Sequence, residues 1–420
     1  MKVLIVNTSE RTGGAAVAAN RLTEALINNG INAKMLVNKK QSSALYVSEA
    51  NGHLLYRHWC FLYERLVIWL NNLLSKKNLF AVSIANTGTD ITITPEFQEA
   101  DIIHLHWVNQ GFLSLKGIRK ILRSGKPVVW TMHDMWEATS ICHHAHECTR
   151  FETECHDCPM LKRPGPKDLS NRVFKKKRDL FNQAGSLTFV AVSQWLAGRS
   201  RCSALIGKFP ITVIPNVISL SRFTIVDRLD ARTALDINEP QVISFGAARI
   251  DDPIKGFSYL AEALRLLTEA GTLNREKVRL LLFGNVRDAL VFNQITVPYT
   301  YLGYVNDEHR LSLIYSASDT TVSSSLYETF GQTLIEAMAC GSVPVSFDGS
   351  GQADIISHRQ NGYLARRLSA ESLAEGILWA LNSHLTPQEL RRSVSRRYSE
   401  SVVANRYAQL YHQLMPSPEY

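Results

Sequence analysis

Short apolar runs alternate with amphipathic stretches through the first half of this chain. Residues 2–7 form an apolar run, residues 13–14 are a glycine turn, and residues 15–29 have helical periodicity. The same alternation predicts further strands at residues 33–37, 101–106, 127–131, 187–192 and 211–214, with a helix over 117–124. Strands that alternate with helices are typical of a parallel sheet covered on both faces.

A second series of the same kind begins with a predicted strand at residues 241–246. A helix over 257–270 follows, and further strands are predicted at residues 278–283, 300–302, 320–323 and 343–346. Because 420 residues exceed one typical core, we expect an α/β protein of two doubly wound, Rossmann-like domains. The expected limits are 1–220 and 221–395, and a helical segment, 396–420, should return to the first domain. Ligands then belong at the carboxyl ends of the strands, in a cleft that the domains face.

The segment 324–341, Ser-Ser-Leu-Tyr-Glu-Thr-Phe-Gly-Gln-Thr-Leu-Ile-Glu-Ala-Met-Ala-Cys-Gly, carries the strongest chemical signal. Thr329 and Gln332 have capping-box spacing, which predicts a helix that begins there. Glu328 then lies just before the helix, and Glu336 lies about two turns inside it. Free N–H groups at a helix start bind anions, and a neighbouring carboxylate binds hydroxyls, so a sugar phosphate fits this place. Two ordinary surface glutamates beside a capped helix are the alternative.

Two cations follow the strand that ends at Gly246. Arg249 offers a fork of donors to phosphate oxygens, and Lys255 offers a mobile point charge. Together they can neutralise a diphosphate without a metal, and the chain has no Asp-x-Asp sequence to hold a divalent ion. We therefore expect metal-independent catalysis. Exposed cations beside Asp251 and Asp252 are the alternative.

Weaker signals lie in the first half. The glycine turn at 13–14 lets the backbone approach a ligand at a helix start, but it lacks the Gly-x-Gly-x-x-Gly order of a dinucleotide site. His133 follows the strand at 127–131 and can bind a ligand hydroxyl or phosphate, with Asp134 orienting it. His104 and His106, on the preceding strand, are expected to be packing residues.

Four cysteines crowd into a segment of the first half, residues 142–158. Cys142, Cys148, Cys155 and Cys158 end in a Cys-x-x-Cys pair, which suits a structural zinc ion. Histidines in the same segment are candidate substitute ligands, namely His143, His144, His146 and His156. Free or packed thiols in a loop are the alternative to zinc.

The net charge of +8 is unevenly distributed. Residues 1–220 hold 27 Lys and Arg against 16 Asp and Glu, whereas residues 221–420 hold 19 against 22. Within the basic half, residues 56–77 are rich in Trp, Tyr and Leu with Arg and Lys near the ends, as in a helix at an anionic membrane surface. A helix buried in the first domain is the alternative. No motif indicates nucleic-acid binding.

The chain starts with a predicted buried strand rather than a signal peptide. No run of 18 apolar residues is free of charge, so no membrane span is predicted. We therefore expect a cytoplasmic protein, peripheral at the inner face of the membrane.

Taken in order, these features resemble the family-4 retaining glycosyltransferases of the GT-B fold. The resemblance covers residues 1 to about 390, and its most specific part is Tyr-Glu-Thr-Phe-Gly-Gln-Thr-Leu-Ile-Glu-Ala-Met-Ala-Cys-Gly-x-Val-Pro-Val. Pro215-Asn216 also fits, although Val217 stands where glycine is usual, and Ala247-Ala248 replaces the usual turn before Arg249. Within the family, the chain is similar to bacterial exopolysaccharide enzymes of the colanic-acid or capsule type.

The resemblance implies a role for each candidate residue. Catalytic roles, in holding the diphosphate and the transferred sugar, are implied for Glu328, His133, Arg249 and Lys255. Donor binding, including the ribose contact of Glu336 and the wall of the base site, is implied for Gly13, Gly14, Gly284, Tyr304, Val305, Thr329, Phe330, Gly331, Gln332 and Glu336.

The resemblance also implies an activity. The enzyme would move a sugar from a nucleotide-diphosphate donor to a lipid-linked oligosaccharide acceptor, with retention at the anomeric carbon. The alternatives are a nucleotide-sugar epimerase of the same fold and a binding protein without catalytic activity.

Overall fold

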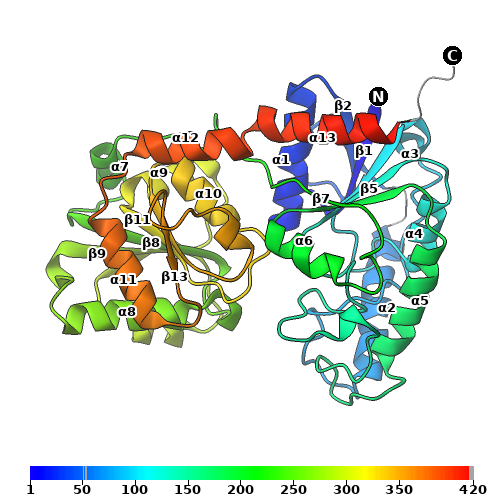
Figure 1. Ribbon diagram of the computed structural model, residues 1–420, viewed down its shortest axis with the longest axis horizontal. Helices are drawn as coiled ribbons and strands as arrows, with labels where there is room; N and C mark the ends of the chain where they lie inside the picture. The colour runs from blue at the N-terminus through cyan, green and yellow to red at the C-terminus, as the bar shows by residue number, and fades with distance from the viewer. Residues whose placement is uncertain (51, 53, 416–420) are drawn as a thin grey trace. The chain divides into compact units, whose positions relative to one another are not determined.

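The computed structural model describes residues 1–50, 52 and 54–415 (Figure 1). The chain divides into two compact units. The first contains residues 1–214 and the segment from Val403 onward, and the second contains residues 215–402. Each unit has its own sheet and core, and each is described by itself.

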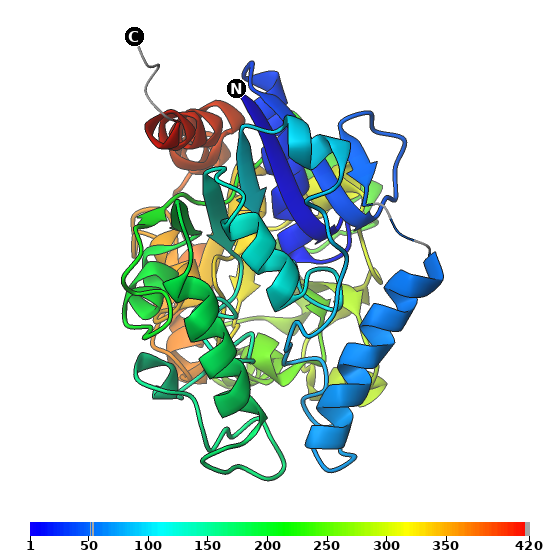
Figure 2. The same cartoon turned by 90° about the vertical axis from the view of Figure 1, so that its right-hand side faces the viewer.

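The first unit is built on a seven-stranded parallel sheet with the order β3-β2-β1-β4-β5-β6-β7. Its strands are β1 Lys2–Ser9, β2 Asn32–Lys39, β3 Val47–Glu49, β4 Ile102–Leu105, β5 Val128–Met132, β6 Leu187–Ala191 and β7 Ile211–Val213. Its helices are α1 Gly14–Asn28, α2 Leu54–Asn71, α3 Pro95–Glu99, α4 Leu115–Leu122, α5 Leu169–Asn182 and α6 Gln194–Arg201, with a 3-10 turn at Arg150–Glu152. In Figure 2, α4 (teal) covers one face of this sheet and α2 (blue) lies along the edge of the unit.

The second unit has a six-stranded parallel sheet with the order β10-β9-β8-β11-β12-β13. Its strands are β8 Gln241–Arg249, β9 Val278–Asn285, β10 Tyr299–Tyr301, β11 Thr320–Ser323, β12 Val343–Phe347 and β13 Tyr363–Ala365. Its α-helices are α7 Arg228–Ala234, α8 Phe257–Glu269, α9 Glu308–Ala317, α10 Gln332–Ala339, α11 Ala370–Leu381 and α12 Pro387–Tyr398. Its 3-10 turns are Pro253–Lys255, Arg275–Lys277, Ala289–Gln294 and Gly351–Asp354.

Central strands of both sheets are apolar without alternation. Every residue of β5, β6 and β12 is buried, because helices cover both faces of a doubly wound sheet. The short apolar runs in the sequence therefore correspond to these strands, and the predicted fold class of two doubly wound α/β units is confirmed.

The last helix, α13 (Glu400–Leu414), packs on the first unit, as predicted for the C-terminal segment. The Tyr411 hydroxyl lies 2.7 Å from Nδ1 of His104 on β4, and the Tyr407 hydroxyl lies 3.0 Å from Oγ1 of Thr131 on β5. Arg406 donates to the Val213 carbonyl at 2.8 Å. Among the described helices, none is both long and apolar enough to cross a membrane.

Candidate active site

Three loops of the second unit meet at the carboxyl edge of its sheet. Strand β8 pairs with β9 on one side and with β11 on the other, all in parallel, so the loops after them leave from the same edge. Arg249 is the last residue of β8, Gly284 lies at the end of β9, and Glu328 lies in the loop after β11. Residues far apart in the sequence are therefore neighbours here, which is where ligands bind in open parallel sheets.

Lys255 and Glu328 form the centre of this site. The Lys255 ammonium Nζ donates to Glu328 Oε2 at 2.8 Å, and both side chains are about one-quarter exposed (26% and 25%). Attraction to the Glu328 carboxylate raises the pKa of Lys255 above its usual value, although partial burial opposes this. Lys255 is therefore charged at neutral pH. Two of the predicted site residues are thus in direct contact, with a positive and a negative group facing one opening.

The backbone around Lys255 is held by a close packing contact at Gly256. Gly256 has a φ of +65°, and a Cβ placed on it would lie 2.0 Å from the Ser324 carbonyl oxygen. Ser324 Oγ donates back to the Gly256 carbonyl at 2.8 Å, and the Leu326 N–H donates to the Ile254 carbonyl at 2.8 Å. Only glycine fits at Gly256, and this contact sets the spacing of the two loops that carry Lys255 and Glu328.

Arg249 is engaged by its own loop. Its terminal nitrogen lies 3.0 Å from Asp252 Oδ2, and its Nε lies 3.7 Å from Asp251 Oδ1, with 32% of the side chain exposed. For Arg249, though not for Lys255, the contacts match the alternative of a cation beside Asp251 and Asp252. A phosphate bound by Arg249 would have to compete with these carboxylates.

Helix α10 begins later than predicted. Its N-cap is Gly331, with a φ of +110°, and no side chain caps it, so the predicted capping box of Thr329 and Gln332 is wrong. The N–H groups of the first helical turn therefore start at Gln332, and those of Thr329 and Phe330 precede the helix. Both amide atoms of Gln332 are buried without a hydrogen-bond partner among the described residues. Gln332 therefore has hydrogen-bonding capacity that the described residues do not use.

Glu336 is a buried residue of α10, only 7% exposed. Its Oε2 accepts a hydrogen bond of 3.2 Å from the Tyr315 hydroxyl on α9. Its role toward a ribose stays a prediction, and Tyr315 is a contact that the sequence did not reveal.

The loop that carries Glu328 is supported by residues that sequence reasoning missed. The Gly351 N–H donates to the Glu328 carbonyl at 2.8 Å, and a Cβ on Gly351 would lie 2.0 Å from the Thr329 carbonyl oxygen. The Gln352 side chain, fully buried, donates to the Ser325 carbonyl at 3.0 Å and accepts from Ser323 Oγ at 3.0 Å. The adjacent Gly-Gln pair was the only available signal.

The predicted wall of the base site lies at the ends of β9 and β10. Gly284 has a φ of +134°, and a Cβ there would lie 1.8 Å from the Ala247 carbonyl oxygen. Its N–H donates to the Gly303 carbonyl at 2.7 Å, next to Tyr304, which is 60% exposed, and to the partly buried Val305. The structure thus places Gly284 beside the turn that carries the other two predicted residues.

In the first unit, the glycine turn forms the start of α1. Gly13 is the N-cap with a φ of +92°, and no side chain caps the helix. Both Gly13 and Gly14 are exposed, and, nearby residues of the chain aside, no atom of the described residues lies within 4 Å of a Cβ placed on either. The helix start is therefore open to a ligand, as expected for a residue pair near a phosphate.

His133 lies directly after β5 and is held by another histidine. Its Nε2 is 2.8 Å from Nδ1 of His106, and the two rings stack with centroids 5.1 Å apart. His106 is 1% exposed, and its Nε2 has no hydrogen-bond partner in the part of the chain that the structure describes. His104 and His106 are both buried, as expected for packing residues, and His106 makes the additional contact with His133 that the sequence did not reveal.

Asp134 contacts other partners. Its Oδ2 accepts from Trp107 Nε1 and lies near His143 Nδ1, both at 2.8 Å, and its Oδ1 accepts from the Trp136 N–H at 2.7 Å. Asp134 was predicted to orient His133. These hydrogen bonds place the His106 ring against His133 instead, and the Asp134 carboxylate against His143.

Burial keeps the histidine cluster neutral. It lowers the pKa of His104 to about 3 and of His133 to about 4, and it lowers the pKa of His106 well below 6.5. His133 is therefore an uncharged hydrogen-bonding group at neutral pH.

We expect acid to destabilise the fold through these imidazoles. A histidine of the unfolded chain takes up a proton below pH 6.5, whereas folded His104 does so only near pH 3. At pH 5.5 each such residue therefore lowers the free energy of unfolding by about 1.4 kcal/mol. Urea unfolding at pH 7.5 and 5.5 should show a loss, and His104→Gln should reduce that loss by about this amount. An equal pH dependence in both proteins would contradict the prediction.

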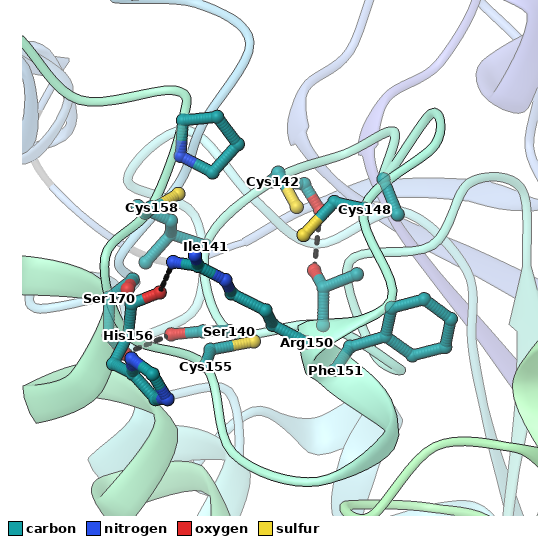
Figure 3. A pocket seen from close by; sticks show the side chains of 13 residues that line it. Ser140, Ile141, Cys142, Cys148, Arg150, Phe151, Cys155, His156, Cys158 and Ser170 are labelled. Carbon is teal, nitrogen blue, oxygen red and sulfur yellow. Dashed lines mark hydrogen bonds between the residues drawn. The ribbon is translucent and has the colours of Figure 1, made fainter. Parts of the chain in front are cut away.

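The four clustered cysteines, all free thiols, line one cavity of the first unit (Figure 3). Burial raises the pKa of Cys142 and Cys155 to about 12 and of Cys158 to about 11. Arg150 lines the same cavity and donates to the His156 carbonyl at 2.6 Å.

Among the described residues, no group of three or more Cys, His, Asp or Glu side chains is arranged to hold a metal ion. This includes the four cysteines of the cavity. The zinc site therefore gains no support from this geometry and stays a prediction, which metal analysis of the purified protein would decide.

Comparison with known proteins identifies related chains. A family model described as Glycosyltransferase Family 4 matches residues 12–222, and a model described as Glycosyl transferases group 1 matches residues 227–398. WcaC of Escherichia coli, named for a role in colanic acid biosynthesis as a glycosyl transferase, is 23% identical over 99% of this chain and 100% of its own length. A phosphatidyl-myo-inositol mannosyltransferase of Mycobacterium tuberculosis is 26% identical over 47% of this chain and 53% of its own.

Solved structures agree on the fold. The Anabaena protein HepE, in a structure with UDP and glucose, has a TM-score of 0.63 and 16% identity, covering 98% of this chain and 100% of its own. A sucrose-phosphate synthase from Thermosynechococcus elongatus has a TM-score of 0.67 and 17% identity, covering 99% of both chains. Because the two family models together match nearly the whole chain, and the first alone matches half of it, the protein belongs to the family-4 glycosyltransferases with a GT-B fold.

Proposed function

We propose that this glycosyltransferase takes its sugar from a nucleotide-diphosphate donor and retains the anomeric configuration. The observation that carries the proposal is the Lys255–Glu328 ion pair at 2.8 Å. It lies at the carboxyl edge of the sheet, where β8 ends at Arg249. The Lys255 ammonium can bind the diphosphate of such a donor, and the neighbouring Glu328 carboxylate can accept hydrogen bonds from its sugar hydroxyls. The structurally similar Anabaena protein, solved in complex with UDP and glucose, supports a donor of this class.

The proposed reaction divides the work among these residues. The bond between the anomeric carbon and the diphosphate oxygen breaks, and its electron pair leaves with the diphosphate. The acceptor hydroxyl bonds to the same face of that carbon, and its proton passes to the departing oxygen. Lys255 and Arg249 stabilise the negative charge that develops on the diphosphate, which is the largest contribution in reactions of this kind. No carboxylate is assigned as a nucleophile.

The remaining residues have binding roles in this proposal. Glu328 accepts hydrogen bonds from the transferred sugar, and neutral His133, held by His106, contacts its hydroxyls. The open start of α1 at Gly14 and the start of α10 at Gln332 supply N–H groups to phosphate. Glu336 binds the ribose, and no metal takes part in catalysis.

The proposed acceptor is a lipid-linked oligosaccharide that grows toward an exopolysaccharide or capsule. Support comes from WcaC, which matches over its full length, and from a Klebsiella pneumoniae protein in a cps region, 22% identical over 95% of this chain. We place the enzyme in the cytoplasm, peripheral to the membrane, where its seven free thiols would stay reduced.

A thermal-shift panel of nucleotide sugars tests the donor. We expect one nucleotide sugar to raise the melting temperature, because a ligand at about 100 times its Kd stabilises the folded state by about 2.7 kcal/mol. The stabilising compound is then incubated without acceptor, and the products are separated. Slow hydrolysis with unchanged sugar supports a transferase, whereas conversion of the nucleotide sugar itself identifies an epimerase. Stabilisation without any turnover, with or without acceptor, identifies a binding protein, and stabilisation by none of the compounds overturns the proposal.

A further inference from the structure

Helix α2 leaves most of its apolar surface uncovered. Of its 18 residues only Cys60, Glu64, Arg65 and Ile68 are buried. Large apolar side chains on the helix and just after it are exposed by 38% to 82%, namely Leu54, Leu55, Tyr56, Trp59, Leu62, Tyr63, Leu66, Leu70, Leu73, Leu74 and Phe80. So many exposed large apolar side chains on one helix are uncommon on a protein that meets only water, and they indicate an interaction site.

Three aromatic residues of this surface, Tyr56, Trp59 and Tyr63, form a row. The rings of Tyr56 and Trp59 stack with centroids 6.0 Å apart, and those of Trp59 and Tyr63 stack at 4.8 Å. Trp59 and Tyr63 also line a shallow hollow, together with Leu62, Arg65, Leu66, Trp69, Lys76 and Leu79. Tyrosine and tryptophan combine an apolar ring with a polar group, which suits the boundary between water and hydrocarbon.

The charged residues between Leu54 and Phe80 are four cations and one carboxylate. Glu64 is the only acidic residue between Leu54 and Phe80, and it is fully buried, 3.0 Å from Arg65 and bonded to the N–H groups of Ile84 and Ala85. No acidic side chain therefore projects from α2 itself.

A basic cluster lies at the far end of α2. Lys76 and Lys77 are exposed there, and so are Lys162 and Arg163 of a distant loop. Two hydrogen bonds join the segments: the Lys162 N–H donates to Asn72 Oδ1 at 2.6 Å, and Asn78 Nδ2 donates to the Met160 carbonyl at 3.0 Å. Four cations are thus gathered next to the apolar surface.

We infer that this surface docks on an anionic lipid bilayer. Helix α2 lies along the interface with its leucines and aromatic rings among the acyl chains, and Lys76, Lys77, Lys162 and Arg163 contact lipid phosphates. Apolar burial supplies affinity, and the cations supply selectivity for anionic lipid. The purpose of this docking rests on the proposed function, because a lipid-linked acceptor is held in such a bilayer.

The test is sedimentation of the full chain with vesicles of phosphatidylcholine, with or without phosphatidylglycerol. We expect binding to the anionic vesicles, weakened by high salt. Leu62→Glu with Leu66→Glu should reduce it at least tenfold. The matched control, Ile93→Glu with Leu229→Glu, changes two exposed apolar residues (both 73%) to the same charge and should bind like wild type. Lys76→Gln with Lys77→Gln should reduce the preference for anionic vesicles, by about fivefold for each lysine.

Failure to bind either vesicle, or equal binding by the Leu62/Leu66 variant, would overturn the inference. Light scattering tests whether a second copy of the chain covers this surface instead. A wild-type protein that is dimeric and does not bind vesicles, together with a monomeric Leu62/Leu66 variant, would show that the surface is a dimer interface. Donor binding is measured separately, without lipid. Donor binding without vesicle binding overturns only this inference, and vesicle binding without donor binding overturns only the proposed function.

Discussion

Replacing Lys255 with methionine is expected to lower the rate of sugar transfer by about 10² to 10³, the usual effect of removing one group that stabilises developing charge. Methionine keeps the length of the side chain but has no charge for the departing diphosphate. The fold should survive, because the Lys255–Glu328 pair is partly exposed and such pairs contribute about 1 kcal/mol or less. Steady-state transfer kinetics with the identified donor, and urea unfolding of the same samples, measure both effects.

Two companion variants show whether the loss comes from this site. Lys277→Met removes an exposed lysine of the same unit and should leave the rate unchanged. Glu328→Gln should also slow transfer, and the double variant should lose less than the product of the two single losses, because the side chains are in contact and act together. A Lys255→Met enzyme with the wild-type rate would contradict the assignment of this site.

Much of the fold follows from patterns that are local in the sequence. The apolar runs that became β5, β6 and β12 have no alternation, which is typical of strands covered on both faces. The edge strands of the two sheets have three residues each; β7 and β10 coincide with predicted apolar runs, whereas β3 and β13 escaped prediction. An edge strand is defined by its pairing with the neighbouring strand, and pairing between distant segments leaves little trace in the sequence.

The start of α10 illustrates a local rule overridden by packing. Thr329 and Gln332 have the spacing of a capping box, but Gly331 takes a φ of +110° with its backbone against Ile355 and Gln352. The helix therefore starts after Gly331. The residues that impose this conformation lie some twenty positions away, in a loop whose approach the spacing rule cannot include.

The contact between His106 and His133 in the first unit could have been predicted from the sequence. His104 and His106 are two residues apart, and on a strand such residues point to the same face. Because β4 and β5 pair in parallel, that face continues to the end of β5, where His133 follows. The period of two, combined with the strand pairing, would have predicted that the buried His106 also lies against His133.

For α2, the composition predicted an apolar helix but could not decide between burial and exposure. Its apolar residues surround the helix, so the pattern alone suits a buried helix and an interfacial helix equally. The structure decides this point, because only four residues of α2 are covered. How much of α2 is exposed depends on which other segments pack against it, and the sequence of the helix alone does not reveal this.

Gly256→Ala is expected to be among the most destabilising single changes in the second unit, with a loss of about 3 kcal/mol or more in the free energy of unfolding. The residue has a φ of +65°, which costs a side chain about 1 to 2 kcal/mol. The new Cβ would also lie 2.0 Å from the Ser324 carbonyl oxygen, so the two loops must separate. Because one loop carries Lys255 and the other leads to Glu328, donor binding should weaken together with stability. Urea unfolding and the donor-induced thermal shift measure the two effects.

Gly271→Ala is the matched control at the opposite end of α8. Gly271 has a φ of +70°, nearly that of Gly256, but apart from its chain neighbours no atom that the structure describes lies within 4 Å of a Cβ placed on it. This variant isolates the backbone cost and should lose only about 1 to 2 kcal/mol with donor binding intact. The difference between the two alanine variants therefore measures the contact of Gly256 with Ser324. Equal losses in both, with donor binding unchanged in both, would mean that this contact does not hold the site together.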